Sequence, residues 1–280
     1  MNLRPEFGLL AVMGSSDIRS VLENWPYDPG HITVRKIVGE DGRVKVQMRL
    51  DLGLLQFELD GRPDAKRPHG YESLLHYHLD RLGEYRRVNG SDVGFELTPS
   101  ECRELRGECS MYYHRYLSLF VLEEFDRVKR DTERNLNVLD LCRRYGAEER
   151  DRLVLQQFRP YLLMMNTRAR VLQAVKAKRW PQALHDVEEG IARIGEFFAE
   201  FGQKKAARRC AELKLLRRLR RKIHRQLPVD PVKKLQRELS AAVGQERYED
   251  AARIRDRIAA MKDRRRKEAS SAKLGEGDDS

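Results

Sequence analysis

Alternating apolar and polar positions predict a small sheet in the first third of the chain. Between residues 32 and 59, three short runs carry an apolar residue at every second position, most clearly at 44–50. Turns at 39–42 and 51–53 separate these runs. The pattern therefore predicts an antiparallel three-stranded meander with one face in water. Its dry face needs a cover, and the leucine-rich segment 71–82 is the expected helix.

The longer stretch from residue 98 onward carries only helical patterns. It begins with a capping box at Thr98 and Glu101, with Pro99 at the first helical position. A short fourth strand is expected just before it, at 94–97. Two similar helix–turn–helix layouts, about 47 residues apart, predict a repeat-like helical body. The expected helices are 99–130, 132–145, 148–178, 181–201 and 203–227, with breaks at Asp131, Gly146 and Arg179–Pro181.

A separate pattern begins at Asp230–Pro231, which reads as an N-cap followed by proline at the first helical position. Two short helices follow, with a turn beginning at Gly244 between them, and each carries one apolar face. Such a hairpin is marginal alone, because helix nucleation is costly and apolar side chains gain stability only when covered. The pattern therefore predicts a hairpin that packs against a partner. The expected contact residues are Val232, Leu235, Leu239, Tyr248, Ala252, Ile258 and Met261.

The residues of this hairpin resemble the UVR motif, which the B and C subunits of the bacterial excision nuclease share. The distinctive run is Tyr-Glu-x-Ala-Ala-x-x-Arg-Asp-x-Ile, beginning at Tyr248, and the resemblance covers 231–262 only. Leu239 stands where Met is common, and Tyr248 where Phe is common. The resemblance implies a protein–protein module in which two hairpins pair, with Arg255 and Asp256 setting the register at the rim. The alternative is an ordinary terminal hairpin packed on its own domain.

Taken together, the patterns predict an α+β fold that is predominantly helical. No apolar run approaches the ~18 residues of a membrane span, and no signal peptide is recognised. Four cysteines without framework spacing fit a reducing cytosol, so a cytoplasmic protein is expected. Met13 is an alternative start. The expected parts are an N-terminal extension with a short helix (1–29), a small antiparallel α+β domain (30–97), the helical repeat-like domain (98–227), the hairpin (231–263) and a disordered tail (268–280).

The net charge of +11 is concentrated in one expected helix, 203–227, which holds eleven Lys and Arg residues against one Glu. Such a surface is typical of proteins that bind the phosphate groups of nucleic acid or of another polyanion. The alternative is a solvated helix whose arginines pair with upstream acids such as Glu189 and Glu200. The segment holds no aromatic residue, so base stacking is not expected. The candidate nucleic-acid-binding residues are Lys204, Lys205, Arg208, Arg209, Arg217, Arg218, Arg221 and Arg225.

Neither catalysis nor metal binding is predicted, and no cofactor is expected. Cys102 and Cys109 lie two helical turns apart, too far for a Cys-x-x-Cys pair, and His76 and His78 point to different sides of a helix. The chain has no Gly-x-x-x-x-Gly-Lys-Ser/Thr phosphate loop and nothing resembling the nuclease segments of the C subunit. Aromatic residues such as Tyr113 and Tyr116 could line a pocket, but core packing and interface cover explain them most simply.

The expected function is therefore non-enzymatic: an adaptor or scaffold whose hairpin docks on a second hairpin, its own copy or a partner's. The alternative is an accessory nucleic-acid binder, related to nucleotide excision repair, that uses the helix at 203–227. An enzyme built within 30–97 would need a pocket with converging polar groups. No membrane partner is expected.

Overall fold

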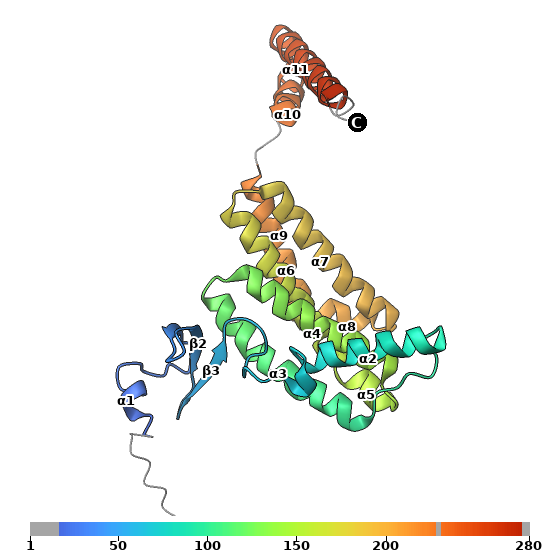
Figure 1. Cartoon of the computed structure of the whole chain (residues 1–280). Helices are drawn as coiled ribbons and strands as arrows, with labels where there is room; N and C mark the ends of the chain where they lie inside the picture. Colours follow the sequence, from blue (N-terminus) through green and yellow to red (C-terminus); the bar gives the residue numbers. More distant parts are fainter. Residues whose placement is uncertain (1–16, 228–230, 276–280) are drawn as a thin grey trace, which may run out of the picture. The chain divides into compact units, whose positions relative to one another are not determined.

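The computed structural model describes the backbone of residues 17–227 and 231–275, and the side chains of 17–227 and 235–263. Helices make up 68% of the chain and a small three-stranded antiparallel sheet accompanies them, which confirms the predicted fold class (Figure 1). The chain divides into two compact units, residues 1–224 and 225–280. In the part of the chain that is described, no helix is long and apolar enough to cross a membrane.

The sheet has the predicted meander order β1 (Val34–Val38), β2 (Val44–Arg49) and β3 (Leu54–Glu58). Its dry face buries Val46, which pairs with Phe57 of β3, as predicted from the alternation. The other face is also partly covered. Gln47 is buried there and accepts a hydrogen bond from Arg35 (2.8 Å), whose guanidinium lies 4.1 Å from the ring centre of Trp25. The short helix α1 (Arg19–Leu22) lies upstream of this tryptophan in the chain.

The helix that covers the sheet is not the predicted one. The short helical turn η1 (Pro68–Gly70) and helix α2 (Leu74–Asn89) follow the sheet, but β2 packs mainly against α3 (Pro99–Val121). Arg115 of α3 donates hydrogen bonds to the backbone carbonyls of Glu58 (3.1 Å) and Gly61 (2.7 Å) at the end of β3. Besides the apolar packing, a buried arginine therefore helps to hold the sheet to α3, which the leucine pattern of α2 did not reveal. The strand expected at 94–97 is one isolated bridge, Leu97 to Gly146.

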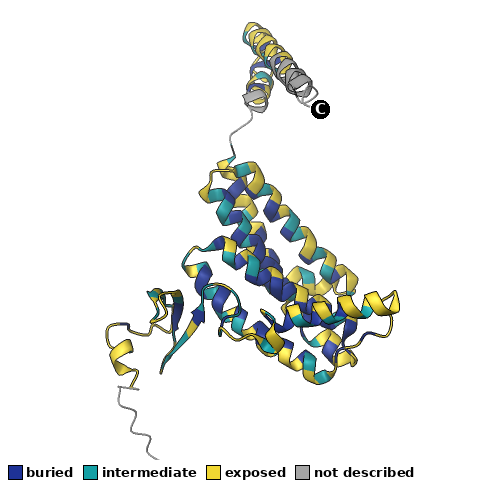
Figure 2. Cartoon of the chain, in the orientation of Figure 1, coloured by how far each residue is buried: buried dark blue, intermediate teal, exposed yellow. Residues whose placement is uncertain are grey.

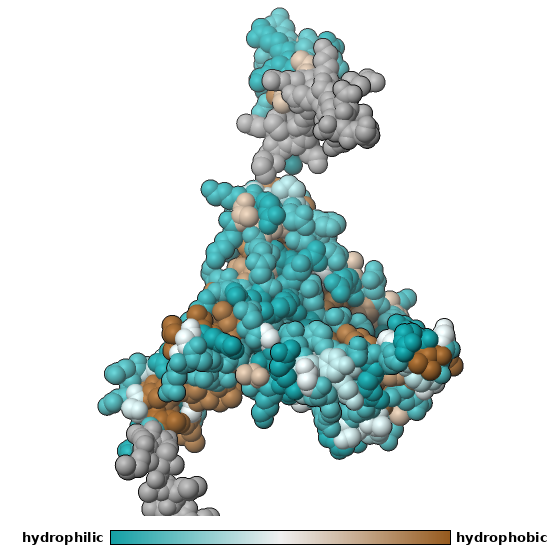
Figure 3. All heavy atoms as spheres, viewed as in Figure 1, coloured by the Kyte–Doolittle hydropathy of each residue, from teal (hydrophilic) through white to brown (hydrophobic). Residues whose placement is uncertain are grey.

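Four long helices form the body in chain order, each packed against the next. They are α3, α4 (Phe125–Tyr145), α6 (Arg159–Lys176) and α7 (Trp180–Glu200), with α5 (Glu149–Val154) and η2 (Gln156–Phe158) between α4 and α6. Helices α6 and α7 approach closely at Gly190, where a Cβ atom would clash with Thr167. Figure 2 shows buried positions concentrated along α3, α4 and α6. The face seen in Figure 3 is largely hydrophilic, with smaller hydrophobic patches.

Several predicted helix boundaries are wrong. The helix expected at 99–130 ends at Val121, and the chain turns through Glu123, whose φ of 57° lies in the left-handed region. Asp131, an expected break, lies inside α4 with its carboxylate fully buried against Arg115. The helix expected at 148–178 is divided into α5, η2 and α6. Gly146 does end α4, as predicted.

The sheet and the helical body share one hydrophobic core. Val46 and Phe57 of the sheet belong to the same buried cluster as Leu105 of α3 and Leu139 of α4. The boundary predicted between the 30–97 and 98–227 domains therefore falls inside one compact unit, because the dry face of the sheet packs on the helices. The prediction of a disordered tail at 268–280 is wrong for residues 268–275, which are helical. The predictions on residues 1–16 and 276–280 fall outside the described residues.

Candidate functional site

The second unit is a helical hairpin of α10 (Pro231–Gly244) and α11 (Tyr248–Gly275), which pack against each other. Three residues join the helices. The amide of Arg247 donates to the carbonyl of Ala242 (2.9 Å), and Glu246 adopts a φ of 57°. This pattern is the usual way to close a helix C-terminus through one left-handed residue. As predicted, the first helix ends at Gly244 and residues 245–247 make the turn, with Glu246 as the left-handed residue.

The hairpin has a hydrophobic core of its own. Leu235 of α10 and Ile258 of α11 are 6% and 8% exposed, and three partly buried residues, Leu239, Ile254 and Met261, pack around them. Near the turn, Ala242 and Ala251 are also buried, because small side chains let the helices approach. Leu235 and Ile258, both predicted partner contacts, therefore lie between the two helices of the hairpin.

Other apolar side chains of the hairpin remain on its surface. Val243 is 50% exposed and Tyr248 is 68% exposed, and Ala252 and Ala259 are exposed as well. At about 100° per residue, Leu239 and Val243 lie along one edge of α10. Tyr248, Ala252 and Ala259 lie along one edge of α11.

These two edges fall on the same side of the hairpin, because α10 and α11 are antiparallel and face each other through their buried residues. Together they form one face, the docking face. It consists of Leu239, Val243, Tyr248, Ala252 and Ala259. The opposite edge carries charged residues, among them Glu238, Asp250 and Arg257. The hairpin therefore carries its exposed apolar side chains on one side, with Arg255 at their border, and charged residues on the other.

The remaining predicted contact residues lie at the border of the docking face or outside the description. Arg255 lies on the same edge as Tyr248 and forms an exposed ion pair with its neighbour Asp256 at 3.2 Å. Both side chains are mostly exposed to solvent, so this ion pair contributes little to the stability of the hairpin. The side chain of Val232 lies outside the described residues. Val243 and Ala259 are additional members of the face, and Val243 follows the same apolar stripe that identified Leu239.

The basic segment is two helices and not one. Helix α8 (Lys204–Arg209) ends at Cys210, where ψ is 120°, and α9 (Ala211–Gln226) begins immediately afterwards. The apolar side of α9 is buried through Leu213, Leu216 and Ile223. All eight candidate nucleic-acid-binding residues, from Lys204 to Arg225, are exposed.

The acidic residues that were expected to neutralise this segment are engaged elsewhere. Glu189 pairs with Arg170 (2.7 Å), and Glu200 pairs with Arg143. Among the ion pairs of residues 17–227, none involves a basic residue of α8 or α9. The alternative interpretation, in which these arginines pair with upstream acids, is therefore not realised for Glu189 or Glu200.

The structure separates the residues considered for metal binding. Cys102 and Cys109 are buried in the body, His76 contacts Ser73 and His78 is buried. Burial raises the pKa of the Cys109 thiol to about 12, so this thiol is protonated at neutral pH. Within the described residues, no group of three or more His, Cys, Asp or Glu side chains is arranged to hold a metal ion.

Comparison with known proteins assigns the hairpin and leaves the body without a counterpart. Neither a curated protein nor a solved structure matches the chain. Residues 230–264 match the protein family described as UVR: UvrB/uvrC motif, the segment that forms α10, the turn and the first part of α11. This motif is a helical hairpin that mediates protein interactions. The C-terminal region of the chain therefore carries a UVR motif.

Proposed function

We propose that this protein is a non-enzymatic adaptor whose UVR hairpin docks on a second UVR hairpin, either that of another copy or that of a partner. The observation that carries the proposal is the docking face. Val243 and Tyr248 remain in water after Leu235 and Ile258 have filled the space between α10 and α11. Contiguous exposed apolar side chains beside a charged edge are typical of interaction surfaces.

The size of the docking face favours a reversible contact. Covering the exposed parts of Val243 and Tyr248 on both of two paired hairpins contributes about 4–8 kcal/mol. Association costs about 4–15 kcal/mol in lost translational and rotational freedom. The half-buried residues Leu239 and Met261 add further area, and Arg255 of one hairpin facing Asp256 of the other supplies the register. The expected contact is therefore concentration-dependent.

Charged residues on the docking face should disrupt this contact. In the full-length chain, the double variant Val243→Asp/Tyr248→Asp is expected to raise the dissociation constant at least about 30-fold, because two unpaired carboxylates would be buried. Sedimentation velocity over a concentration series measures self-association. The same series with an excision-nuclease B or C subunit measures association with a partner hairpin.

A matched control lies on the opposite edge of the hairpin. Arg257→Glu introduces the same change in net charge but lies away from the docking face, so association should be unchanged. Far-UV circular dichroism confirms that both variants keep their helices. The proposal is wrong if the wild-type chain neither self-associates nor binds a UVR-bearing subunit, or if the double variant associates as the wild type does.

A second function, binding of nucleic acid or another polyanion, is proposed for α8 and α9. It is favoured by the basic residues of α8 and α9, which are exposed and have no ion pair within residues 17–227. Each phosphate contact lowers the log–log salt slope of binding by about 0.9. The triple variant Arg217→Ala/Arg218→Ala/Arg221→Ala should therefore flatten the slope for duplex DNA by about 2.7, as measured by fluorescence anisotropy.

The control for this prediction is a triple variant with the same loss of charge elsewhere. Arg103, Arg150 and Lys178 are exposed, and the described structure gives them no ion-pair partner. Their replacement by Ala should leave the slope nearly unchanged. Equal slopes for wild type and the α9 variant, or no DNA binding at low salt, would exclude this second function.

A further inference from the structure

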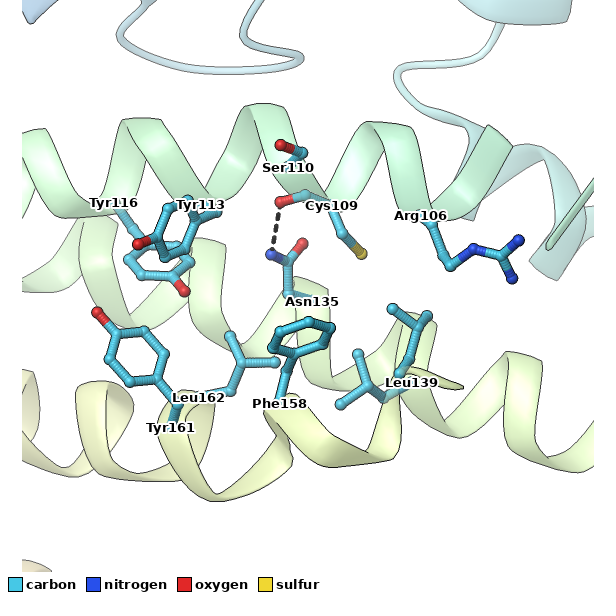
Figure 4. Close-up of a pocket in the computed structure, with 11 residues that line it drawn as sticks. Arg106, Cys109, Ser110, Tyr113, Tyr116, Asn135, Leu139, Phe158, Tyr161 and Leu162 are labelled. Carbon is cyan, nitrogen blue, oxygen red and sulfur yellow. Dashed lines mark hydrogen bonds between the residues drawn. The ribbon is translucent and has the colours of Figure 1, made fainter. Parts of the chain in front are cut away.

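The helical body contains a cavity that the hairpin does not explain. Its volume is about 430 Å³, and it lies between α3, α4 and the start of α6 (Figure 4). Most of its wall is apolar, formed by Leu139, Leu155, Leu162 and the ring of Phe158. Phe158 is 52% exposed, so the mouth of the cavity is lined by an apolar ring that faces solvent.

One end of the cavity gathers three tyrosines. The rings of Tyr113 and Tyr116 meet edge to face at 5.5 Å, and Tyr161 from α6 lies 6.2 Å from Tyr113. Figure 4 shows the three rings grouped at the end opposite Arg106. Helix α3 supplies the first two because residues three apart lie on the same side of a helix.

Tyr116 is the most informative of these residues. Its side chain is 1% exposed, and among the described residues no hydrogen bond reaches its hydroxyl. The hydroxyl is not among the fully buried polar atoms that lack a partner, so it remains accessible from the cavity. Burial raises the pKa of Tyr116, and it raises the pKa of Tyr161 to about 12, so both hydroxyls are protonated at neutral pH and can donate.

The cavity offers no free charge to a ligand. Arg106, at the far end, pairs with the buried carboxylate of Asp151 at 2.7 Å. The side-chain amide of Asn135 donates to the Cys109 carbonyl (3.0 Å) and accepts from Arg134 (3.0 Å). A charged ligand would therefore enter an apolar space without a counterion, which is strongly unfavourable.

We infer that this cavity binds an uncharged aromatic molecule of two or three fused rings, with a carbonyl oxygen that accepts a hydrogen bond from Tyr116. The apolar walls and the ring of Phe158 match the flat faces of such a molecule. The size follows from volume, because a cavity of about 150 Å³ holds benzene and this cavity is nearly three times larger. The site lies in the larger unit and does not depend on the docking function of the hairpin.

The test uses a matched pair of fluorescent probes with the full-length chain. The first probe, 6-propionyl-2-(dimethylamino)naphthalene, is uncharged, carries a ketone and shifts its emission to the blue in apolar sites. The second, 2-(dimethylamino)naphthalene, lacks the ketone. We expect saturable binding of both at one site per chain. Tyr116→Phe should raise the dissociation constant of the ketone probe about five- to tenfold and leave that of the other probe unchanged.

A second variant closes the mouth of the cavity. Ser110 lines the cavity on α3 and is exposed, so Ser110→Trp should abolish binding of both probes without disturbing the core. Arg103→Trp, an exposed position on the same helix outside the cavity, is the control and should bind both normally. If Ser110→Trp fails to fold, Phe158→Ala takes its place and should weaken both probes.

Three results would overturn the inference. The first is no saturable blue shift with the wild-type chain. The second is normal probe binding by a folded Ser110→Trp variant, or by Phe158→Ala where that variant replaces it. This result would show that the probe binds at another surface. The third is an equal effect of Tyr116→Phe on both probes, which would show that Tyr116 donates no hydrogen bond to the ketone.

Discussion

Replacing Asp131 with Ala is expected to lower the free energy of unfolding of the larger unit by about 3–5 kcal/mol. Arg115 donates two hydrogen bonds to the Asp131 carboxylate, at 2.7 and 2.8 Å, and neither side chain has any exposed surface. Removing the carboxylate would leave a buried guanidinium without its counterion. The same guanidinium holds the carbonyls of Glu58 and Gly61, so the attachment of the sheet would weaken as well.

Urea unfolding followed by tryptophan fluorescence measures this effect on the larger unit alone. Both tryptophans, Trp25 and Trp180, lie in that unit, and the hairpin has none. The control is Asp140→Ala on the same helix, where an exposed carboxylate pairs with Arg159. It should cost at most about 1 kcal/mol. Equal losses in the free energy of unfolding for the two variants would show that the buried Arg115–Asp131 pair contributes no more to stability than an exposed pair.

A double variant separates the charge from the space it fills. Arg115→Met/Asp131→Leu replaces the pair with apolar side chains, which often restores most of the lost stability. Here the recovery should be incomplete, because Met cannot donate to the carbonyls of Glu58 and Gly61. Hydrogen exchange at the end of β3 should remain faster than in the wild type.

Replacing Ile258 with Asp is expected to unfold the hairpin and leave the larger unit intact. The core of the hairpin is small, and Ile258 is one of its two most buried large side chains. Burying an unpaired carboxylate there costs several kcal/mol, which exceeds what a core of this size supplies. The far-UV circular dichroism signal of α10 and α11, 14 and 28 residues long, should be lost.

The control for this variant is the neighbouring position Ala260, which is exposed and lies away from both the core and the docking face. Ala260→Asp should keep the full helical signal, and the tryptophan transition should be the same in both variants. Full retention of helicity by Ile258→Asp would contradict the hairpin core. This variant also distinguishes loss of the hairpin from loss of docking, which Val243→Asp/Tyr248→Asp tests in a folded hairpin.

Much of the secondary structure follows from local pattern. The strands were predicted because residues 44–50 alternate between the two faces of a sheet, which is a property of neighbouring residues. Helix boundaries were less predictable. Asp has a lower helix propensity than Ala or Leu, but the buried pairing of Asp131 with Arg115, sixteen positions away, overrides that preference.

The candidate sites show the same division between local and distant information. The apolar stripes of the hairpin were visible in the sequence. Which of their residues are buried, as Ile258 is, and which are exposed, as Tyr248 is, depends on where the other helix lies. A pocket lined by Tyr113 and Tyr116 was considered from the sequence, but core packing was preferred as the explanation. At helical spacing, Tyr113 and Tyr116 look the same whether their rings fill a core or line an open space, and Tyr161 comes from a different helix.

The two hydrophobic clusters have no side chain in common. On the proposed docking function, variation in the docking face can therefore alter partner recognition while the stability of the larger unit stays constant. Selection can act on recognition and on folding separately. Variants in the docking face are accordingly expected to be losses of recognition, with normal amounts of protein in the cell.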